Sequence, residues 1–276
     1  MKKVKNDSTK LIIFSDIHYA PVVLNKNFEG TQRKLTKYAP VLANKLIEVV
    51  NNIKPDAVIS LGDLIQDAPT HVEDVENLKH IWSVFKQFKV PFFSISGNHD
   101  LLRIPRKEVS DIMGYDDHNF SKNIGAHHLI FLGLDVDNEK TNEVGGILKS
   151  RRLSNSTIKW LENDLSQNCL PTIIFIHYGV AEDDMKDNFW FSKHPEYALL
   201  ENRKELKRIL QNDKNVVAVF SGHQHWTKRL VENNIKYYVV GSLTENLNND
   251  GVPDGVYFEV DIEDDKLTVT EHHLKI

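Results

Sequence analysis

The chain has 276 residues, 41% hydrophobic and 26% charged, a composition typical of a globular protein that excludes disorder over most of its length. Its net charge of −5 disfavours broad nucleic-acid binding, which requires a positive surface to neutralise phosphates. The single cysteine excludes an internal disulfide, and no apolar run forms a secretory leader or reaches the ~18 residues of a membrane span. We expect one cytoplasmic domain over residues 1–276, with a flexible start at residues 1–9.

Short apolar runs rich in β-branched and aromatic residues recur along the chain and predict strands that are buried on both faces. These runs are Leu11–Phe14, Ala57–Leu61, Pro91–Ile95, Leu129–Leu134, Thr172–Ile176, Val216–Phe220 and Tyr237–Val240. Amphipathic stretches between them predict helices. The helices are expected over Tyr38–Ile53, over Val72–Phe88, after a cap at Ser154 or Ser156, and from Pro195 to about Leu210.

The pattern changes after Phe220, where strands are expected to follow one another without long helices between them. These strands are Ile235–Val240, Gly255–Asp261 and Lys266–Glu271. The alternation of apolar and polar residues in Val256–Val260 favours a strand at or near a sheet edge. The sequence therefore predicts an α/β fold with mixed sheets, either one sheet or a pair.

Five predicted strands end in side chains that can bind metals or transfer protons. In chain order these side chains are Asp16 and His18, then Asp63, then Asn98, His99 and Asp100, then His177, then His223 and His225. Each motif alone has an ordinary structural explanation, such as a turn or a capping residue. Ligands of α/β proteins bind at the carboxyl ends of strands, so five such motifs in order indicate one shared site.

The residue types at these strand ends indicate the kind of metal. Mixed imidazole and carboxylate ligands suit Mn, Fe, Zn or Co better than Ca or Mg, which prefer oxygen shells. Thiolates are absent from the motifs, which disfavours a structural zinc cage. The number of ligands is too large for one ion and suits two divalent ions that share a carboxylate.

The ordered motifs resemble those of the calcineurin-like metallophosphoesterases, over roughly Leu11 to Val240. The motifs are Asp16-Ile17-His18, Gly62-Asp63 with Asp67, Gly97-Asn98-His99-Asp100, His177 and Gly222-His223-Gln224-His225. The resemblance implies a four-layer α/β/β/α sandwich with two mixed sheets. It also implies a ligand assignment: Asp16, His18 and His225 on one ion, Asn98, His177 and His223 on the other, and Asp63 bridging.

The implied chemistry is the hydrolysis of a phosphodiester, pyrophosphate or phosphomonoester by a hydroxide held between the two ions. The resemblance gives His99 the role of donating a proton to the leaving group or stabilising the transition state, and a histidine suits that role near neutral pH. Two interpretations stay open for Asp100, which either orients His99 or accepts backbone N–H bonds in its own loop. Asp67 is expected to brace the loop.

The substrate is less well defined by the sequence. The arginine that protein phosphatases carry after the second motif is missing after Asp67. The compact chain looks more like the small bacterial cyclic-nucleotide phosphodiesterases and the manganese-dependent ADP-ribose and CDP-alcohol hydrolases. It differs from the cyclic-nucleotide group in that His177 is not followed by the second histidine and the prolines usual there. We therefore expect a small nucleotide-like substrate. Residues 19–37 and 181–194 are expected to be active-site insertions, with substrate contacts from Tyr19, Arg33, Tyr178 and Trp190.

Two alternatives remain. A nuclease of the same superfamily would hydrolyse single-stranded DNA with a steep dependence on salt. A non-catalytic interaction module on the same fold would be expected to have lost ligands, and the motifs contain the full set.

Overall fold

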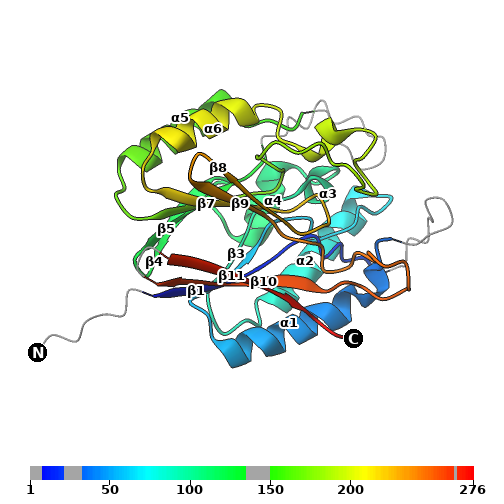
Figure 1. The fold of residues 1–276 in the computed structure, drawn as a ribbon. Coiled ribbons are helices and arrows are strands. Elements are labelled where there is room, and N and C mark those ends of the chain that lie inside the picture. Colours follow the sequence, from blue (N-terminus) through cyan, green and yellow to red (C-terminus); the bar gives the residue numbers. More distant parts are fainter. Residues whose placement is uncertain (1–7, 22–32, 135–149, 264–265) are drawn as a thin grey trace, which may run out of the picture.

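The computed structural model describes residues 8–21, 33–134, 150–263 and 266–276. Two β-sheets pack face to face, with helices on their outer sides (Figure 1). Helices α1 (Ala39–Ile53) and α2 (His71–Phe85) cover one sheet, and α5 (Asn155–Ser166) and α6 (Arg203–Asn212) cover the other. The predicted α/β/β/α sandwich is confirmed.

The first sheet has the order β11-β10-β1-β2-β3. Its strands are β1 (Thr9–Phe14), β2 (Ala57–Ser60), β3 (Phe92–Ser94), β10 (Val256–Glu263) and β11 (Lys266–His273). Strands β1, β2 and β3 are parallel, and β10 and β11 extend the sheet in antiparallel pairing. As expected from its alternating pattern, β10 lies next to an edge strand.

The second sheet has the order β4-β5-β6-β7-β9-β8. Its strands are β4 (Phe120–Ile124), β5 (His127–Leu132), β6 (Thr172–Ile176), β7 (Val216–Ser221), β8 (Lys228–Glu232) and β9 (Ile235–Val239). The four central strands are parallel, and the two edge strands are antiparallel to their neighbours. Both sheets are therefore mixed.

Successive residues of the central strands enter different cores. In β1, Ile13 packs in the core between the sheets, whereas Ile12 faces the outer core under the helices. Both faces are fully buried, which explains why these strands are continuously apolar rather than alternating. Each such side chain contributes roughly 1.5–3 kcal/mol relative to an exposed one.

Two helix boundaries differ from the expectation. The helix predicted from Pro195 to about Leu210 is split into a 3-10 turn at Pro195–Ala198 and α6, which begins at Arg203. The break arises because the intervening chain pairs with the segment after β6, where Leu200 N–H donates to Gly179 O at 2.9 Å. Ser154 caps α5 by accepting from Thr157 N–H, so the first of the two proposed caps is used.

Among the described residues, the elements that the sequence did not predict include the strands β4 and β8, the helices α3 (Asn98–Leu101) and α4 (Arg106–Met113), and the 3-10 turn η1 (Thr36–Tyr38). The two strands are sheet edges with exposed polar positions, so they lack the apolar run of a central strand. The predicted flexible start is wrong at Thr9, which is buried in β1, while residues 1–7 lie outside the described part of the chain. Residues 22–32 of the first predicted insertion also lie outside it.

Among the described residues, no helix is long and apolar enough to cross a membrane.

Candidate metal centre

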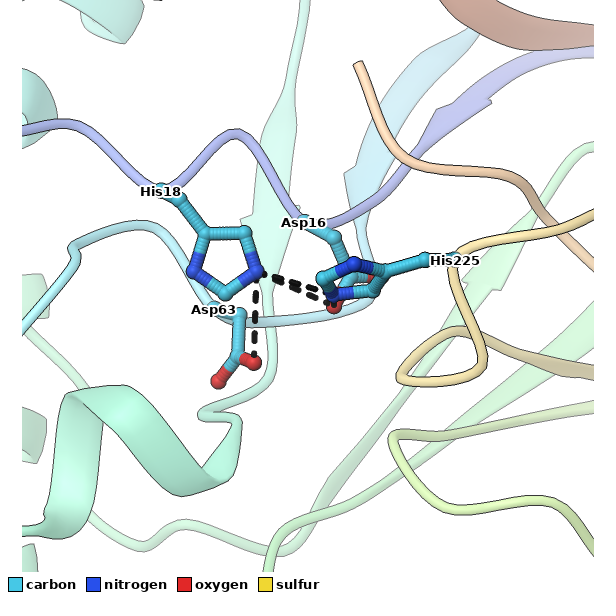
Figure 2. Close-up of side chains that lie close together, drawn as sticks. All are labelled: Asp16, His18, Asp63 and His225. Atoms are coloured by element: carbon cyan, nitrogen blue, oxygen red, sulfur yellow. Dashed lines mark hydrogen bonds and ion pairs between the residues drawn. The ribbon is translucent and has the colours of Figure 1, made fainter. Parts of the chain in front are cut away.

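The predicted ligands converge at one edge of the sandwich, where β1, β2, β6 and β7 end and α3 begins. Two groups of potential metal-binding atoms form there, each within 4.8 Å. The first group consists of Asp16, His18, Asp63 and His225, drawn in Figure 2. The second group consists of Asp63, His177 and His223. Asp63 belongs to both, which is the position expected of a carboxylate shared by two ions.

The potential ligand atoms of the first group lie close together. The Nε2 atoms of His18 and His225 lie 3.0 Å apart, a separation that suits two neighbouring ligand atoms of one ion. Asp16 Oδ1 lies 3.4 Å from His225 Nε2, and Asp63 Oδ2 lies 3.8 Å from His18 Nε2. All four residues are buried.

The second group gains Asn98 from α3. His177 Nε2 lies 3.5 Å from Asp63 Oδ2 and 3.0 Å from Asn98 Oδ1. His223 faces the site differently, because its Nε2 lies 3.0 Å from Tyr197 O and donates to that carbonyl. Nδ1 is therefore the atom that His223 can offer to an ion.

Each carboxylate of the centre is held by one oxygen and leaves the other for a cation. Asp63 Oδ1 accepts from His99 N–H at 2.8 Å, and Asp16 Oδ2 accepts from His223 N–H at 3.0 Å and from the Ser15 hydroxyl. Within the described part of the chain, the other oxygens, Asp16 Oδ1 and Asp63 Oδ2, are buried without a hydrogen-bond partner. Buried acceptors without a partner are costly, so their positions fit a cation-binding function.

The charge states also suit metal binding. Burial lowers the pKa of His18 and of His223 well below the usual range, which favours the neutral imidazole that binds metals. Burial acts to raise the pKa of Asp63, but His177 and His99 outweigh it and hold that pKa well below the usual range. His18 and His223 are thus neutral beside an ionised carboxylate. Burial acts to lower the pKa of His177 and of His225, but Asp63 outweighs it and raises the pKa of His177 to about 9, and Asp16 and Glu245 raise the pKa of His225, so these two rings must release a proton to bind an ion.

The backbone of the centre is in an unusual conformation. Five predicted ligands have positive φ angles between 46° and 66°, namely Asp16, His18, Asp63, His223 and His225. This left-handed conformation costs roughly 1–2 kcal/mol for each residue with a Cβ. Hydrogen bonds between the loops offset part of the cost, since Asp16 N–H donates to Gly62 O and His18 N–H to Asp63 O. Strained residues that cluster in this way are typical of functional sites.

The tight approach of two loops explains why Gly97 precedes Asn98. A Cβ at Gly97 would lie 2.1 Å from Asp63 Oδ1 and 2.5 Å from Asp63 N. We predict that Gly97→Ala lowers the free energy of unfolding by about 1–3 kcal/mol or more, because the Asp63 loop must move. Urea denaturation measures the change. Gly114→Ala is the control, since a Cβ there meets nothing within 4 Å and costs only its φ of 77°. Equal stability of the two variants would contradict the close-approach explanation.

His99 lies beside the first ligand group, and the centroid of its ring is 4.8 Å from that of the His18 ring. Its Nδ1 is 2.6 Å from Asp67 Oδ1, and its Nε2 is 3.0 Å from Lys34 Nζ. Burial acts to raise the pKa of Asp67, but the hydrogen bond with His99 outweighs it and lowers that pKa to about 2. An ionised Asp67 thus accepts from His99 Nδ1–H and orients the ring, with Nε2 beside Lys34 Nζ.

The contacts of the two acidic residues near His99 differ from the expectation for Asp67 and favour one of the two open interpretations for Asp100. Asp100 Oδ1 and Oδ2 accept from the N–H groups of Ile65 and Gly97 at 3.1 and 2.8 Å. Asp100 thus braces the loops, which was one of its two open interpretations, and Asp67 contacts His99. Asp100 follows His99 directly in the sequence, but its side chain turns back to the backbone at the N-terminus of its own helix.

The four predicted substrate contacts differ in how the structure places them. Tyr178 is 1% exposed, and its ring packs on that of His223 with ring centroids 4.2 Å apart. It therefore supports the candidate ligand His223 and is not accessible to a substrate. Tyr19 is also buried, and its ring stacks on His80 of α2. The guanidinium of Arg33 pairs with Glu245 at 3.0 Å and lies over the Phe189 ring. Trp190 is partly exposed beside His225, with ring centroids 6.0 Å apart.

Two residues of the centre were not predicted from the sequence. Lys34 reaches His99 and also donates to Gln66 Oε1 at 3.3 Å, and burial lowers the pKa of its ammonium. Glu245 accepts from His225 Nδ1 at 2.9 Å. Neither lies in a motif, because Lys34 is in an insertion and Glu245 is 20 residues after the histidine that it contacts.

The chain is similar to known phosphodiesterases and phosphatases. The chain is 28% identical over 199 residues to a probable glycerophosphodiester phosphodiesterase from Arcobacter nitrofigilis, covering 66% of the chain and 64% of the relative. It is 29% identical over 203 residues to a serine/threonine-protein phosphatase from Pongo abelii, covering 70% of the chain and 59% of the relative. The chain thus matches less than two thirds of the length of either relative.

The fold has a close structural counterpart in a dimetal phosphatase from Danio rerio. The two superpose with a TM-score of 0.73 at 13% identity, over 95% of each chain. The family model of the calcineurin-like phosphoesterases matches residues 9–227, which contain every predicted ligand. The chain therefore belongs to the calcineurin-like phosphoesterase family.

Proposed function

We propose that this protein is a phosphohydrolase with two divalent ions. Asp16, His18 and His225 would bind one ion, Asn98, His177 and His223 the other, and Asp63 both. The observation that carries the proposal is the placement of Asp63, which belongs to both ligand groups. Its Oδ2 lies 3.8 Å from His18 Nε2 and 3.5 Å from His177 Nε2, and it is buried without a hydrogen-bond partner within the described residues. When bound, such an ion pair activates water as a nucleophile and offsets charge on the phosphoryl oxygens.

The protein's own groups would manage the proton of the leaving group. His99 is oriented by Asp67 through Nδ1, and its Nε2 would donate the proton to the leaving group. Lys34 lies next to the same Nε2, where its ammonium would contact a phosphoryl oxygen or the leaving oxygen. The charge that develops in the transition state would therefore meet fixed donors that need no reorganisation.

The donor set favours Mn, Fe, Zn or Co over Ca or Mg, because imidazoles supply four of the seven ligands. The chain's one cysteine, Cys169, is exposed and supplies no ligand to either group. A chain without an internal disulfide is compatible with a cytoplasmic location, which we propose as its place of action.

Removing the charge of Lys34 should impair phosphoryl binding. We predict that Lys34→Met lowers kcat/KM by about 10–100-fold, the effect of losing a hydrogen bond to a charged group. Steady-state hydrolysis of bis-p-nitrophenyl phosphate measures the change. Lys37→Met is the matched control, because Lys37 is exposed and lies over the Tyr38 ring. Wild-type kinetics in Lys34→Met would exclude a role for Lys34 in the reaction.

We propose a small phosphorylated substrate of nucleotide type. The net charge of −5 supports a small substrate over a nucleic acid, and the aromatic side chains of Phe189 and Trp190 near His225 would stack on a base. The test is a metal-supplemented screen over cyclic nucleotides, nucleoside diphosphate derivatives, phosphomonoesters and phosphodiester lipids. Single-stranded DNA serves as the comparison, and preferential cleavage of DNA would favour the nuclease alternative.

A further inference from the structure

Glu245 is a buried carboxylate that contacts three parts of the site at once. Its side chain accepts from His225 Nδ1 at 2.9 Å and from Trp190 Nε1 at 3.3 Å through Oε2. The other oxygen, Oε1, accepts from Arg33 Nε at 3.0 Å. The residue is 1% exposed, so water hardly competes for these contacts. Glu245 thus contacts one predicted metal ligand, His225, and two residues of the wall beside it, Arg33 and Trp190, so it can influence both the ligand and its neighbours.

The backbone around Glu245 is fixed to the same two regions. Toward the centre, Ser242 Oγ donates to Asp16 O at 2.7 Å and Leu243 N–H donates to Ser15 O at 3.1 Å. Toward the wall, Leu35 N–H donates to Thr244 O and Asn246 N–H to Arg33 O, both at 2.8 Å. The carboxylate is therefore presented from a rigid segment and not from a free loop.

A carboxylate that accepts from the distal nitrogen of a metal-binding histidine fixes the tautomer and the orientation of that ring. With Nδ1–H donated to Glu245, the Nε2 lone pair of His225 is directed to the first ligand group. Loss of such an outer contact lowers metal affinity by about 10–100-fold in other proteins.

The side chains of Arg33, Phe189 and Trp190 would form a substrate wall beside His225, and this wall depends on the same carboxylate. Arg33 is held by Glu245 and lies over the Phe189 ring, 4.8 Å from its centroid, while the Trp190 indole is held by its N–H. Arg33 and Trp190 come from segments far apart in the sequence, and each contributes one hydrogen bond to Glu245. Without that shared acceptor, neither side chain keeps its charge-assisted contact.

We propose that Glu245 is a positioning residue that joins the first ion site to the substrate wall formed by Arg33, Phe189 and Trp190. One carboxylate would then set both the affinity of the ion bound by His225 and the placement of the wall. This inference rests on the proposed function, because it requires His225 to bind an ion.

Glu245→Gln tests the ion-binding half of the proposal. Mn²⁺ is titrated by calorimetry into metal-stripped wild-type and variant protein. We expect the wild type to bind two equivalents, and the variant to bind one of them about 10–100-fold more weakly with the other unchanged. In the His225→Ala background, Glu245→Gln should cause no further loss, because Glu245 acts through His225. Trp190→Phe, which keeps the Glu245–His225 contact, should bind Mn²⁺ as the wild type does.

The wall half of the proposal is tested by kinetics at saturating Mn²⁺ with the best substrate of the screen. Once the ion is restored, Glu245→Gln should recover most of kcat and keep a KM raised about 3–10-fold, the effect of a lost hydrogen bond or two. A residue that only stabilised the fold would not separate the two constants. Full recovery of both constants would contradict the link to the wall.

Each result has a defined consequence. Two unchanged Mn²⁺ affinities in folded Glu245→Gln would overturn the positioning role and leave the two-ion function intact. A wild-type protein that binds fewer than two equivalents would contradict the proposed function itself and the role of Glu245 with it. If circular dichroism shows that Glu245→Gln is unfolded, Glu245→Asp keeps the charge but is one methylene shorter, and the same loss of affinity is expected. Wild-type affinity in Glu245→Asp would then overturn the proposal.

Discussion

Asp63→Asn should remove both ions and lower the hydrolysis of bis-p-nitrophenyl phosphate by at least about 10³-fold. Asp63 is the residue shared by the two ligand groups, and its Oδ2 has no hydrogen-bond partner among the described residues. A neutral amide weakens the attraction for both cations at once. Mass spectrometry of bound metal and steady-state kinetics measure the two losses.

Thermal stability gives an independent measurement on the same variant. Mn²⁺ at 1,000 times its dissociation constant should stabilise the wild type by about 4 kcal/mol, since ligands that bind the folded state favour it. Asp63→Asn should show little of this stabilisation. Asp164→Asn is the matched control, because Asp164 also contacts a histidine, His128, at 2.6 Å but belongs to neither ligand group. Retention of two ions by Asp63→Asn would exclude the bridging position.

His99→Ala should keep both ions and lose about 10²–10⁴-fold in turnover of substrates with poor leaving groups, the usual contribution of a general acid. With a p-nitrophenolate leaving group the loss should be smaller, because that anion departs without a proton. The measurement is kcat for a series of phosphodiesters whose leaving-group pKa values differ, together with metal content. Loss of metal in His99→Ala would instead make His99 a ligand.

The two acids beside His99 provide a comparison for this prediction. Asp67→Asn should repeat part of the His99→Ala defect, because an amide is a weaker acceptor for Nδ1–H than a carboxylate. Asp100→Asn should instead lower the free energy of unfolding by about 1–3 kcal/mol, because it leaves a backbone N–H without its acceptor. The opposite outcome would restore Asp100 as the residue that orients His99.

The sequence was sufficient to predict that the candidate ligands converge, because their signal lies in chain order. Asp16, Asp63 and His177 each follow an apolar run, and parallel strands bring such ends to one edge. The central strands were predictable for the same reason, since burial on both faces requires continuous apolar residues. The edge strands β4 and β8 were not, because an exposed edge carries polar side chains and resembles a loop.

The residues around the ligands could not be predicted because they meet through the fold alone. Lys34 and His99 are 65 residues apart, and Arg33 and Glu245 are 212 apart. No periodicity or spacing relates such pairs. Arg33 was expected to contact the substrate, and its guanidinium pairs with Glu245. Tyr178 was also expected to contact the substrate but is buried against His223. Residue type alone does not distinguish these roles.

The central claim is that two ions and the ligands around Asp63 carry out phosphoester hydrolysis. The most direct test is to titrate Mn²⁺ into metal-stripped protein while recording the hydrolysis of bis-p-nitrophenyl phosphate. We predict that activity is absent after chelation with EDTA and reaches its maximum when two equivalents of Mn²⁺ are bound. Full activity after exhaustive chelation would contradict the two-ion account.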